Sequence, residues 1–263
     1  LLAAPLLGPA AYSQVDTTRF AEVDSRLEEY FRALERESVE VKNEECDFLI
    51  SSTSDSLLRQ RVALRCYNHF KESPLMGDEA VAIHLTDKWF STGKVEMENS
   101  VALIDAKIFA EFNRRSLLGC QAPLMEMAHT GGVKVRVGEP CGSYSVIYFY
   151  DTSCAKCRLE SVLLRSFLEN NSVRIVFYAI YTGLDRQAWK TWIGDRLDVS
   201  NPSTKVLNLW DPSIDSDYQR KYGVLSTPRM FLLDRRGVIV GRGLDVESLS
   251  ALLERYSRDH DYV

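Results

Sequence analysis

The 263-residue sequence has little histidine, no long apolar run and no long run of one charge. The four histidines are scattered without metal-ligand spacing, so we interpret each as an ordinary surface or core residue: His69, His84, His129 and His260. No apolar stretch is long enough to span a bilayer. No basic tract is interleaved with aromatic residues and the formal net charge is −5, so nothing favours a nucleic-acid partner. What is present, 45% hydrophobic and 26% charged residues, is typical of a globular protein of one or two domains.

The first residues are apolar and end in Ala11-Tyr-Ser13, a small-x-small pattern of the kind found before a signal cleavage point. We interpret residues 1–13 as the remnant of a secretory signal whose basic start is missing. A flexible apolar terminus is the alternative. Export would place the protein in the periplasm or elsewhere in the bacterial cell envelope, where disulfides form and are exchanged.

Residues 14–118 carry helical spacing and no strand alternation, which predicts an all-α domain of unknown role. One helix covers 20–34, a second begins near Ser54 or Asp55, a third spans 81–90, and a fourth carries Val101, Ile104, Ile108, Phe109 and Phe112. Gly119 is the expected C-cap of this region.

After Gly119 the pattern alternates between strands and helices. We expect a hairpin around Thr130-Gly-Gly132, a buried strand over 144–150, a helix over 154–170 carrying Leu159, Val162, Leu163 and Phe167, and a strand over 173–181. A helix over 186–197, a strand over 206–210, a short helix over 218–222, a hairpin over 230–240 and a helix over 246–256 follow. The strand–helix–strand unit predicts an α/β sandwich in residues 119–263.

The chemistry centres on Cys154-Ala-Lys-Cys157, which lies between the buried strand and the helix. A thiol pair with this spacing at a helix start predicts a redox-active dithiol. Cys154, at the helix start, is the expected attacking thiolate, and Cys157 resolves the mixed disulfide. A static disulfide or two half-buried thiols is the alternative. A zinc site with Cys120 and Cys141 is disfavoured because those two are far apart in sequence.

Three stretches together resemble a known family: 148–157 with the thiol pair, Asp211-Pro212, and 222–237 with Ser226-Thr227-Pro228. They are similar to the exported TlpA/ResA-like thiol-disulfide oxidoreductases of the thioredoxin fold, and Gly119-Cys-Gln-Ala-Pro123 resembles the start that those proteins share with peroxiredoxins. The resemblance covers about residues 119–258. It implies a thioredoxin-like α/β/α sandwich after an all-α domain.

The resemblance also implies roles for particular residues. Pro228 would be cis and lie against the thiol pair, where Thr227 offers its backbone to substrate. Glu160 would tune the thiols and handle a proton, with a solvated helix glutamate as the alternative. Ser153 departs from the family, in which tryptophan commonly precedes the first cysteine, so substrate preference and reduction potential are expected to differ. Several aromatic residues could supply an apolar rim to the site in place of that tryptophan, but we favour their assignment to the core: Tyr148, Tyr150, Trp189, Trp192 and Trp210.

The other cysteines are Cys46, Cys66, Cys120 and Cys141. Cys66 lies on an apolar helix stripe and is expected to be buried. Structural disulfides between Cys46 and Cys66, or between Cys120 and Cys141, are open alternatives, since sequence does not assign pairing.

These observations predict an exported protein thiol-disulfide oxidoreductase, in the reductase direction. Its partners would be protein thiols or disulfides and a membrane thiol reductant. No metal, flavin or nucleotide is implied, only a redox-active Cys154–Cys157 disulfide. The alternative is a redox-inactive thioredoxin-fold binding module whose helical domain makes the interaction. Peroxide reduction is disfavoured because the stretch before Cys154 lacks the proline of peroxide-reducing sites.

Overall fold

The computed structural model describes residues 13–260, and the chain divides into two compact units, Leu1–Ala110 and Glu111–Val263. The predicted signal segment therefore lies outside the described residues, apart from Ser13, where the first helix begins. Among residues 13–260, no helix is both long and apolar enough to cross a membrane.

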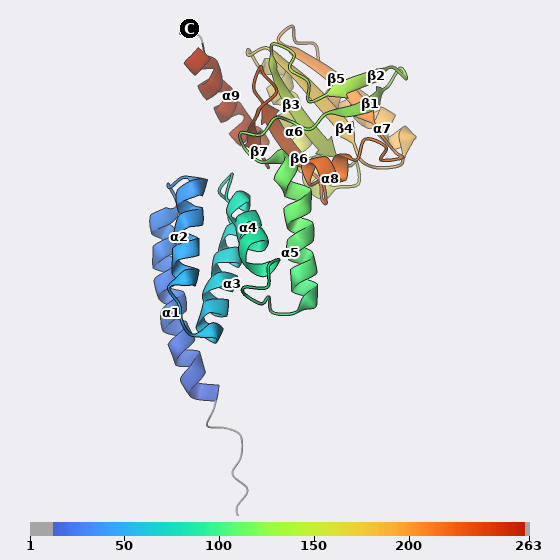
Figure 1. Cartoon of the computed structure of the whole chain (residues 1–263). Helices are drawn as coiled ribbons and strands as arrows, with labels where there is room; N and C mark the ends of the chain where they lie inside the picture. The colour runs from blue at the N-terminus through green and yellow to red at the C-terminus, as the bar shows by residue number, and fades with distance from the viewer. Residues whose placement is uncertain (1–12, 261–263) are drawn as a thin grey trace, which may run out of the picture. The chain divides into compact units, whose positions relative to one another are not determined.

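The first unit is helical (Figure 1). Its elements are α1 (Ser13–Leu34), α2 (Val39–Ser51), α3 (Ser56–Glu72), α4 (Glu79–Leu85), the π-helical turn η1 (Thr86–Phe90) and α5 (Ser100–Asn113), which continues into the second unit. Asp55 caps α3 by accepting a hydrogen bond from Leu58 N–H at 2.9 Å, which confirms the predicted helix start. Phe31, Cys66 and Phe70 are among the buried residues of one apolar core.

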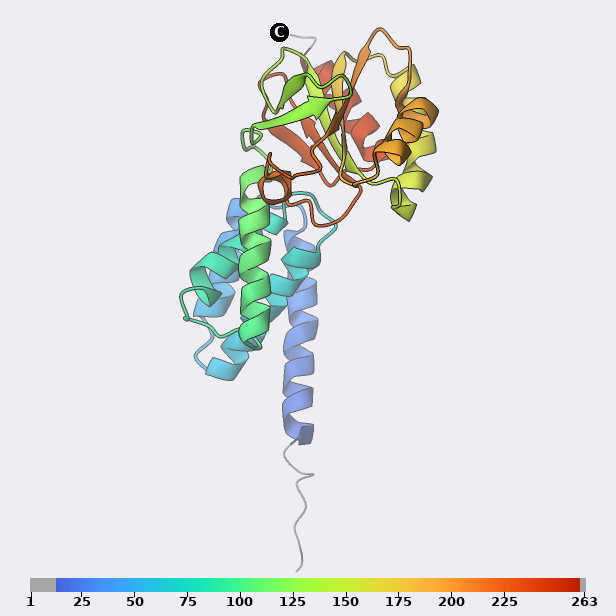
Figure 2. The same ribbon diagram turned by 90° about the vertical axis from the view of Figure 1, so that its right-hand side faces the viewer.

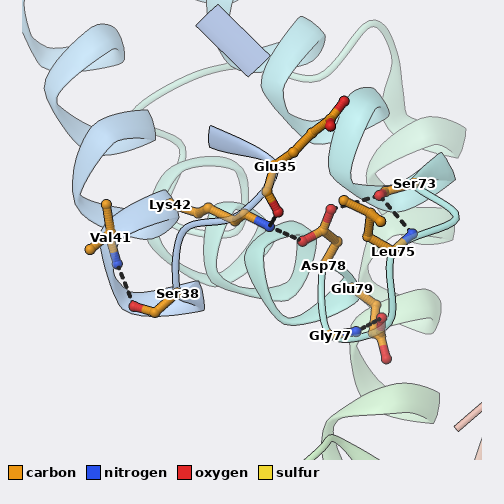
Figure 3. A network of polar contacts seen from close by, with 9 residues as sticks. All are labelled: Glu35, Ser38, Val41, Lys42, Ser73, Leu75, Gly77, Asp78 and Glu79. Carbon is orange, nitrogen blue, oxygen red and sulfur yellow. Dashed lines mark hydrogen bonds and ion pairs between the residues drawn. The ribbon is translucent and has the colours of Figure 1, made fainter. Parts of the chain in front are cut away.

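Helix α2 is absent from the sequence-based prediction because its buried face carries a charge: Lys42 beside Cys46 and Ile50. Lys42 Nζ lies 2.6 Å from Asp78 Oδ1, with only 5% and 4% of the two side chains exposed. Figure 3 shows the surrounding contacts, in which Lys42 also donates to a backbone carbonyl and Asp78 accepts from Ser73 Oγ at 2.6 Å. The ammonium is thus neutralised by a residue 36 positions along the chain, which local periodicity does not reveal.

Helix α5 is confirmed, but it buries another face than its large side chains suggest. Val101, Ile104 and Ile108 are exposed, whereas Ala106 and Ala110 are buried. The expected C-cap at Gly119 is wrong. The helix ends at Asn113 and is followed by one 3₁₀ turn, η2 (Arg114–Ser116). Gly119 does adopt a left-handed conformation (φ +78°), but its N–H donates to the Ile239 carbonyl at 2.9 Å.

The strands of the second unit, within the described range, form one seven-stranded sheet in the order β2-β1-β5-β4-β3-β6-β7. The strands are β1 (Met125–His129), β2 (Lys134–Val137), β3 (Tyr144–Tyr150), β4 (Ile175–Tyr181), β5 (Thr204–Trp210), β6 (Arg229–Leu233) and β7 (Ile239–Arg242). β3, β4 and β5 run parallel, while β1 pairs antiparallel with β5 and β6 antiparallel with β3. Every residue of β3 is buried, as expected for a central strand.

Helices cover both faces of this sheet (Figures 1 and 2). They are α6 (Ala155–Asn170), α7 (Arg186–Trp192) with the π-helical turn η3 (Ile193–Leu197), α8 (Tyr218–Tyr222) and α9 (Val246–His260). Residues of α6, α7 and α9 share one core with the sheet, and α8 contributes to the core on the opposite face. Helix α6 buries Cys157, Ser161, Leu164 and Leu168, whereas Leu159, Val162 and Leu163 of the expected stripe are exposed.

Candidate active site

Cys154 is the N-cap residue of α6, directly after the turn that follows β3. Its backbone is extended (φ −69°, ψ 120°), and its Sγ accepts a hydrogen bond from Cys157 N–H at 3.2 Å. The sulfur thus takes the place in which serine or aspartate side chains commonly cap a helix. Because the first N–H groups of a helix are unpaired and partly positive, this position favours the thiolate over the thiol.

The pKa of the Cys154 thiol lies below its ordinary value. Burial alone raises this pKa, but hydrogen bonds with the Cys157 side chain, the Cys157 backbone N–H, Thr227 and the Lys156 backbone N–H together outweigh it. Cys154 also remains partly exposed. A partly accessible sulfur that ionises readily has the properties of an attacking nucleophile.

Cys157 lies one turn further along α6 and is completely buried. Burial, and then the hydrogen bond and charge of Cys154, raise the pKa of the Cys157 thiol to about 12. The two sulfurs therefore differ in accessibility and in acidity, with the more acidic one at the surface.

Thr227 and Pro228 lie beside Cys154 although 73 residues separate Thr227 from it. Their peptide bond is cis, as the family resemblance implied. They precede β6, and β6 pairs with β3 so that Arg229 stands opposite Phe149. In the thiol form, Cys154 Sγ–H donates to the Thr227 carbonyl oxygen at 3.2 Å. The backbone of Thr227 thus lies beside the Cys154 sulfur.

Ser153 is exposed and takes part in the turn before Cys154. Its N–H and its Oγ both donate to Asp151 Oδ1, at 2.7 and 2.6 Å. Arg158 holds the same turn, since one of its guanidinium nitrogens donates to the Thr152 and Ser153 carbonyls at 3.2 and 2.7 Å. The turn is therefore fixed by side chains on both sides of the thiol pair.

Glu160 follows one turn after Cys157, and its side chain is only 14% exposed. The alternative of a solvated helix glutamate does not fit this burial. Its Oε1 lies 3.6 Å from Lys156 Nζ. Burial raises the pKa of the Glu160 carboxyl, although Lys156 opposes the shift. A carboxyl with a raised pKa is a better proton acceptor than an ordinary glutamate.

The sequence reasoning did not include in the site two residues near the thiol pair: Arg158, which holds the turn before Cys154, and Tyr148, which shares a buried core with Cys157. Arg158 directly follows the second cysteine, which was the one available signal. Tyr148 lies in an apolar strand and was interpreted as core. Tyr148, Tyr150 and Trp189 are indeed buried.

All six cysteines lie in the described part of the chain and are thiols. Cys46 and Cys66 are fully buried, and a hydrogen bond with Cys66 and then burial raise the pKa of Cys46. Within residues 13–260, no three His, Cys, Asp or Glu side chains are grouped so that they could hold a metal ion.

No protein-family model matches the chain, and none of the curated proteins is significantly similar to it in sequence. Among solved structures, the chain is similar to a thioredoxin-like protein from Bacteroides caccae, with 12% identity and a TM-score of 0.68 over 94% of this chain and 87% of that one. This likeness confirms the predicted thioredoxin-like α/β fold with a preceding helical region.

Two further solved structures, both of thiol-disulfide oxidoreductases, are similar to about half of this chain. The thioredoxin domain of one from Bacteroides vulgatus is 21% identical, with a TM-score of 0.45 over 53% of this chain and 96% of that one. Another, from Bacteroides fragilis, is 22% identical, with a TM-score of 0.42 over 52% of this chain and 98% of that one.

Proposed function

We propose that the protein is an exported thiol-disulfide oxidoreductase that reduces protein disulfides through Cys154 and Cys157. The observation that carries the proposal is the contrast between the two sulfurs. Cys154 is partly exposed, has a lowered pKa and lies 3.2 Å from the Thr227 carbonyl, whereas Cys157 is buried and has a raised pKa.

The contrast supports the following order of steps. The Cys154 thiolate attacks one sulfur of a substrate disulfide, a mixed disulfide forms, and the other substrate sulfur leaves and takes a proton. Glu160 accepts the proton of Cys157, whose thiolate then attacks the Cys154 sulfur. The Cys154–Cys157 bond forms, the bond from Cys154 to the substrate breaks, and two electrons have passed to the substrate.

Thr227, Pro228 and Ser153 form the substrate-binding surface in this proposal. Thr227 lies beside the sulfur through its carbonyl group, so an extended peptide next to the substrate cysteine meets the Thr227 backbone there, and the exposed Ser153 lies in the turn directly before Cys154. Reduction of the resulting Cys154–Cys157 disulfide requires a thiol donor, which we assign to a membrane thiol reductant of the cell envelope. The chemistry needs no metal, flavin or nucleotide.

The test is reduction of insulin by the protein in the presence of dithiothreitol, followed by turbidity. Cys154→Ser is the control variant. We expect the parent to accelerate precipitation and the variant to match the uncatalysed rate. Equal rates for parent and variant would contradict the proposal.

A further inference from the structure

Tyr148 is a completely buried tyrosine in the middle of β3, on the sheet face that packs against α6. It belongs to the same apolar core as Cys157. Its hydroxyl oxygen is inaccessible to solvent and makes no hydrogen bond within the described part of the chain. A buried hydroxyl without a partner is costly, and phenylalanine would fill the same space without that cost.

The surroundings of this hydroxyl contain the ionisable groups of the active site. After burial, the groups whose negative charge most raises the pKa of Tyr148 are Cys157, Glu160 and Cys154, in that order. The hydroxyl therefore keeps its proton and acts as a hydrogen-bond donor. Glu160 Oε2 is a second buried oxygen for which the described residues supply no hydrogen-bond partner. Tyr148 and Glu160 thus each carry a buried oxygen that has no hydrogen-bond partner among the described residues.

Resting on the oxidoreductase function proposed above, we propose that the Tyr148 hydroxyl donates a hydrogen bond to the Cys157 thiolate while that thiolate attacks Cys154. Cys157 is neutral before this step and bonded to Cys154 after it, so its negative charge exists only while the mixed disulfide is being resolved. A hydrogen-bond donor that meets the Cys157 thiolate only during this attack accelerates resolution of the mixed disulfide. It stabilises neither the Cys157 thiol before the attack nor the Cys154–Cys157 disulfide after it.

The electron and proton balance is that of the exchange reaction itself. The Cys157 proton passes to Glu160, the Cys157–Cys154 bond forms, and the electron pair of the broken bond leaves with the substrate sulfur. Tyr148 keeps its proton throughout.

Tyr150 provides a matched control. It lies two residues along the same strand, is also completely buried, and stacks on Tyr148 with ring centroids 5.5 Å apart. After burial, its pKa responds to the Trp189 indole and to Tyr181 before Cys157. Tyr150→Phe therefore removes a neighbouring buried hydroxyl whose surroundings differ from those of the thiol pair.

The experiment uses the full chain with Cys120 and Cys141 replaced by serine, because these two are the other accessible thiols. The reduced protein is mixed with a chromogenic aromatic disulfide. Attack by Cys154 releases the first coloured thiolate, and attack by Cys157 on the mixed disulfide releases the second. The two phases report the two sulfurs separately.

We expect Tyr148→Phe to leave the first phase unchanged and to slow the second about tenfold, equivalent to about 1.4 kcal/mol of transition-state stabilisation. Tyr150→Phe should change neither phase. An unchanged second phase in Tyr148→Phe would overturn the inference, as would equal slowing of both phases, which is the mark of a packing defect. If the parent itself releases only one thiolate, the proposed function fails instead.

Discussion

Replacement of Lys42 by methionine tests how the helical unit is stabilised. Lys42 and Asp78 form an ion pair with an N–O distance of 2.6 Å and almost no solvent exposure. Lys42→Met keeps most of the side-chain volume but leaves the Asp78 carboxylate buried without its cation. Breaking a buried pair in this way costs about 3–5 kcal/mol.

The chain also contains a surface ion pair with nearly the same N–O distance, which serves as a control. Arg26 and Glu22 lie 2.7 Å apart, with 77% and 68% of their side chains exposed. Solvent screens such a pair, so Arg26→Met should cost less than about 1 kcal/mol. The two ion pairs that these variants break therefore differ in burial rather than in N–O distance.

The assay is urea unfolding of the full chain, followed by the circular dichroism of its helices. With a denaturant dependence of about 2 kcal/mol per molar urea, Lys42→Met should lower the midpoint of the first unit by about 2 M. Lys42→Met combined with Asp78→Leu should recover most of this loss, because no unpaired charge remains. Equal midpoints for Lys42→Met and Arg26→Met, or a double variant as unstable as Lys42→Met, would refute the reasoning.

Three further predictions concern the active site. The rate at which iodoacetamide alkylates Cys154 follows the fraction of Cys154 that is thiolate. Because the pKa of Cys154 is lowered, its alkylation should stay fast at pH values at which an ordinary cysteine no longer reacts. Cys157 should ionise only near pH 12. Glu160→Gln removes the proposed proton acceptor and should slow release of the second thiolate by at least about tenfold while release of the first stays unchanged. Equal rates of second release for the parent and the variant would exclude proton transfer by Glu160. Arg158→Ala removes the hydrogen bonds to the Thr152 and Ser153 carbonyls and should slow insulin reduction several-fold. Arg158→Lys keeps the positive charge and should be as slow as Arg158→Ala, because the hydrogen bonds rather than the charge hold the turn.

Much of the second unit follows from local sequence. The buried strand 144–150, the helix after it and the hairpin around Gly131 and Gly132 are confirmed, because each combines a clear apolar pattern with turn residues at its ends. Apolar patterns of the same kind predicted the wrong buried face where residues distant in sequence determine which side of a helix is covered. On α6, Leu159, Val162 and Leu163 are exposed, whereas Ser161 is buried next to a core that contains Tyr148 and Cys157.

In the first unit, α2 was missed because Lys42 interrupts its apolar stripe, and only the fold brings Asp78 to it. The site shows the same division. Cys154 and Cys157 are placed by local sequence at the helix start, whereas Thr227 reaches them through the pairing of β3 with β6. Sequence spacing alone provides no reason to link Tyr148 to the proposed chemistry, because only the packing of the sheet against α6 brings Tyr148 and Cys157 into one core.

The most direct test of the central claim is a redox titration of Cys154 and Cys157 in glutathione or dithiothreitol buffers, with the thiols counted by mass spectrometry. We predict one reversible two-electron transition that disappears in Cys154→Ser and in Cys157→Ser. A midpoint of about −270 mV would agree with the proposed reductase direction, whereas about −120 mV would mark an oxidant. The absence of a reversible transition, or one that persists in both variants, would contradict the account.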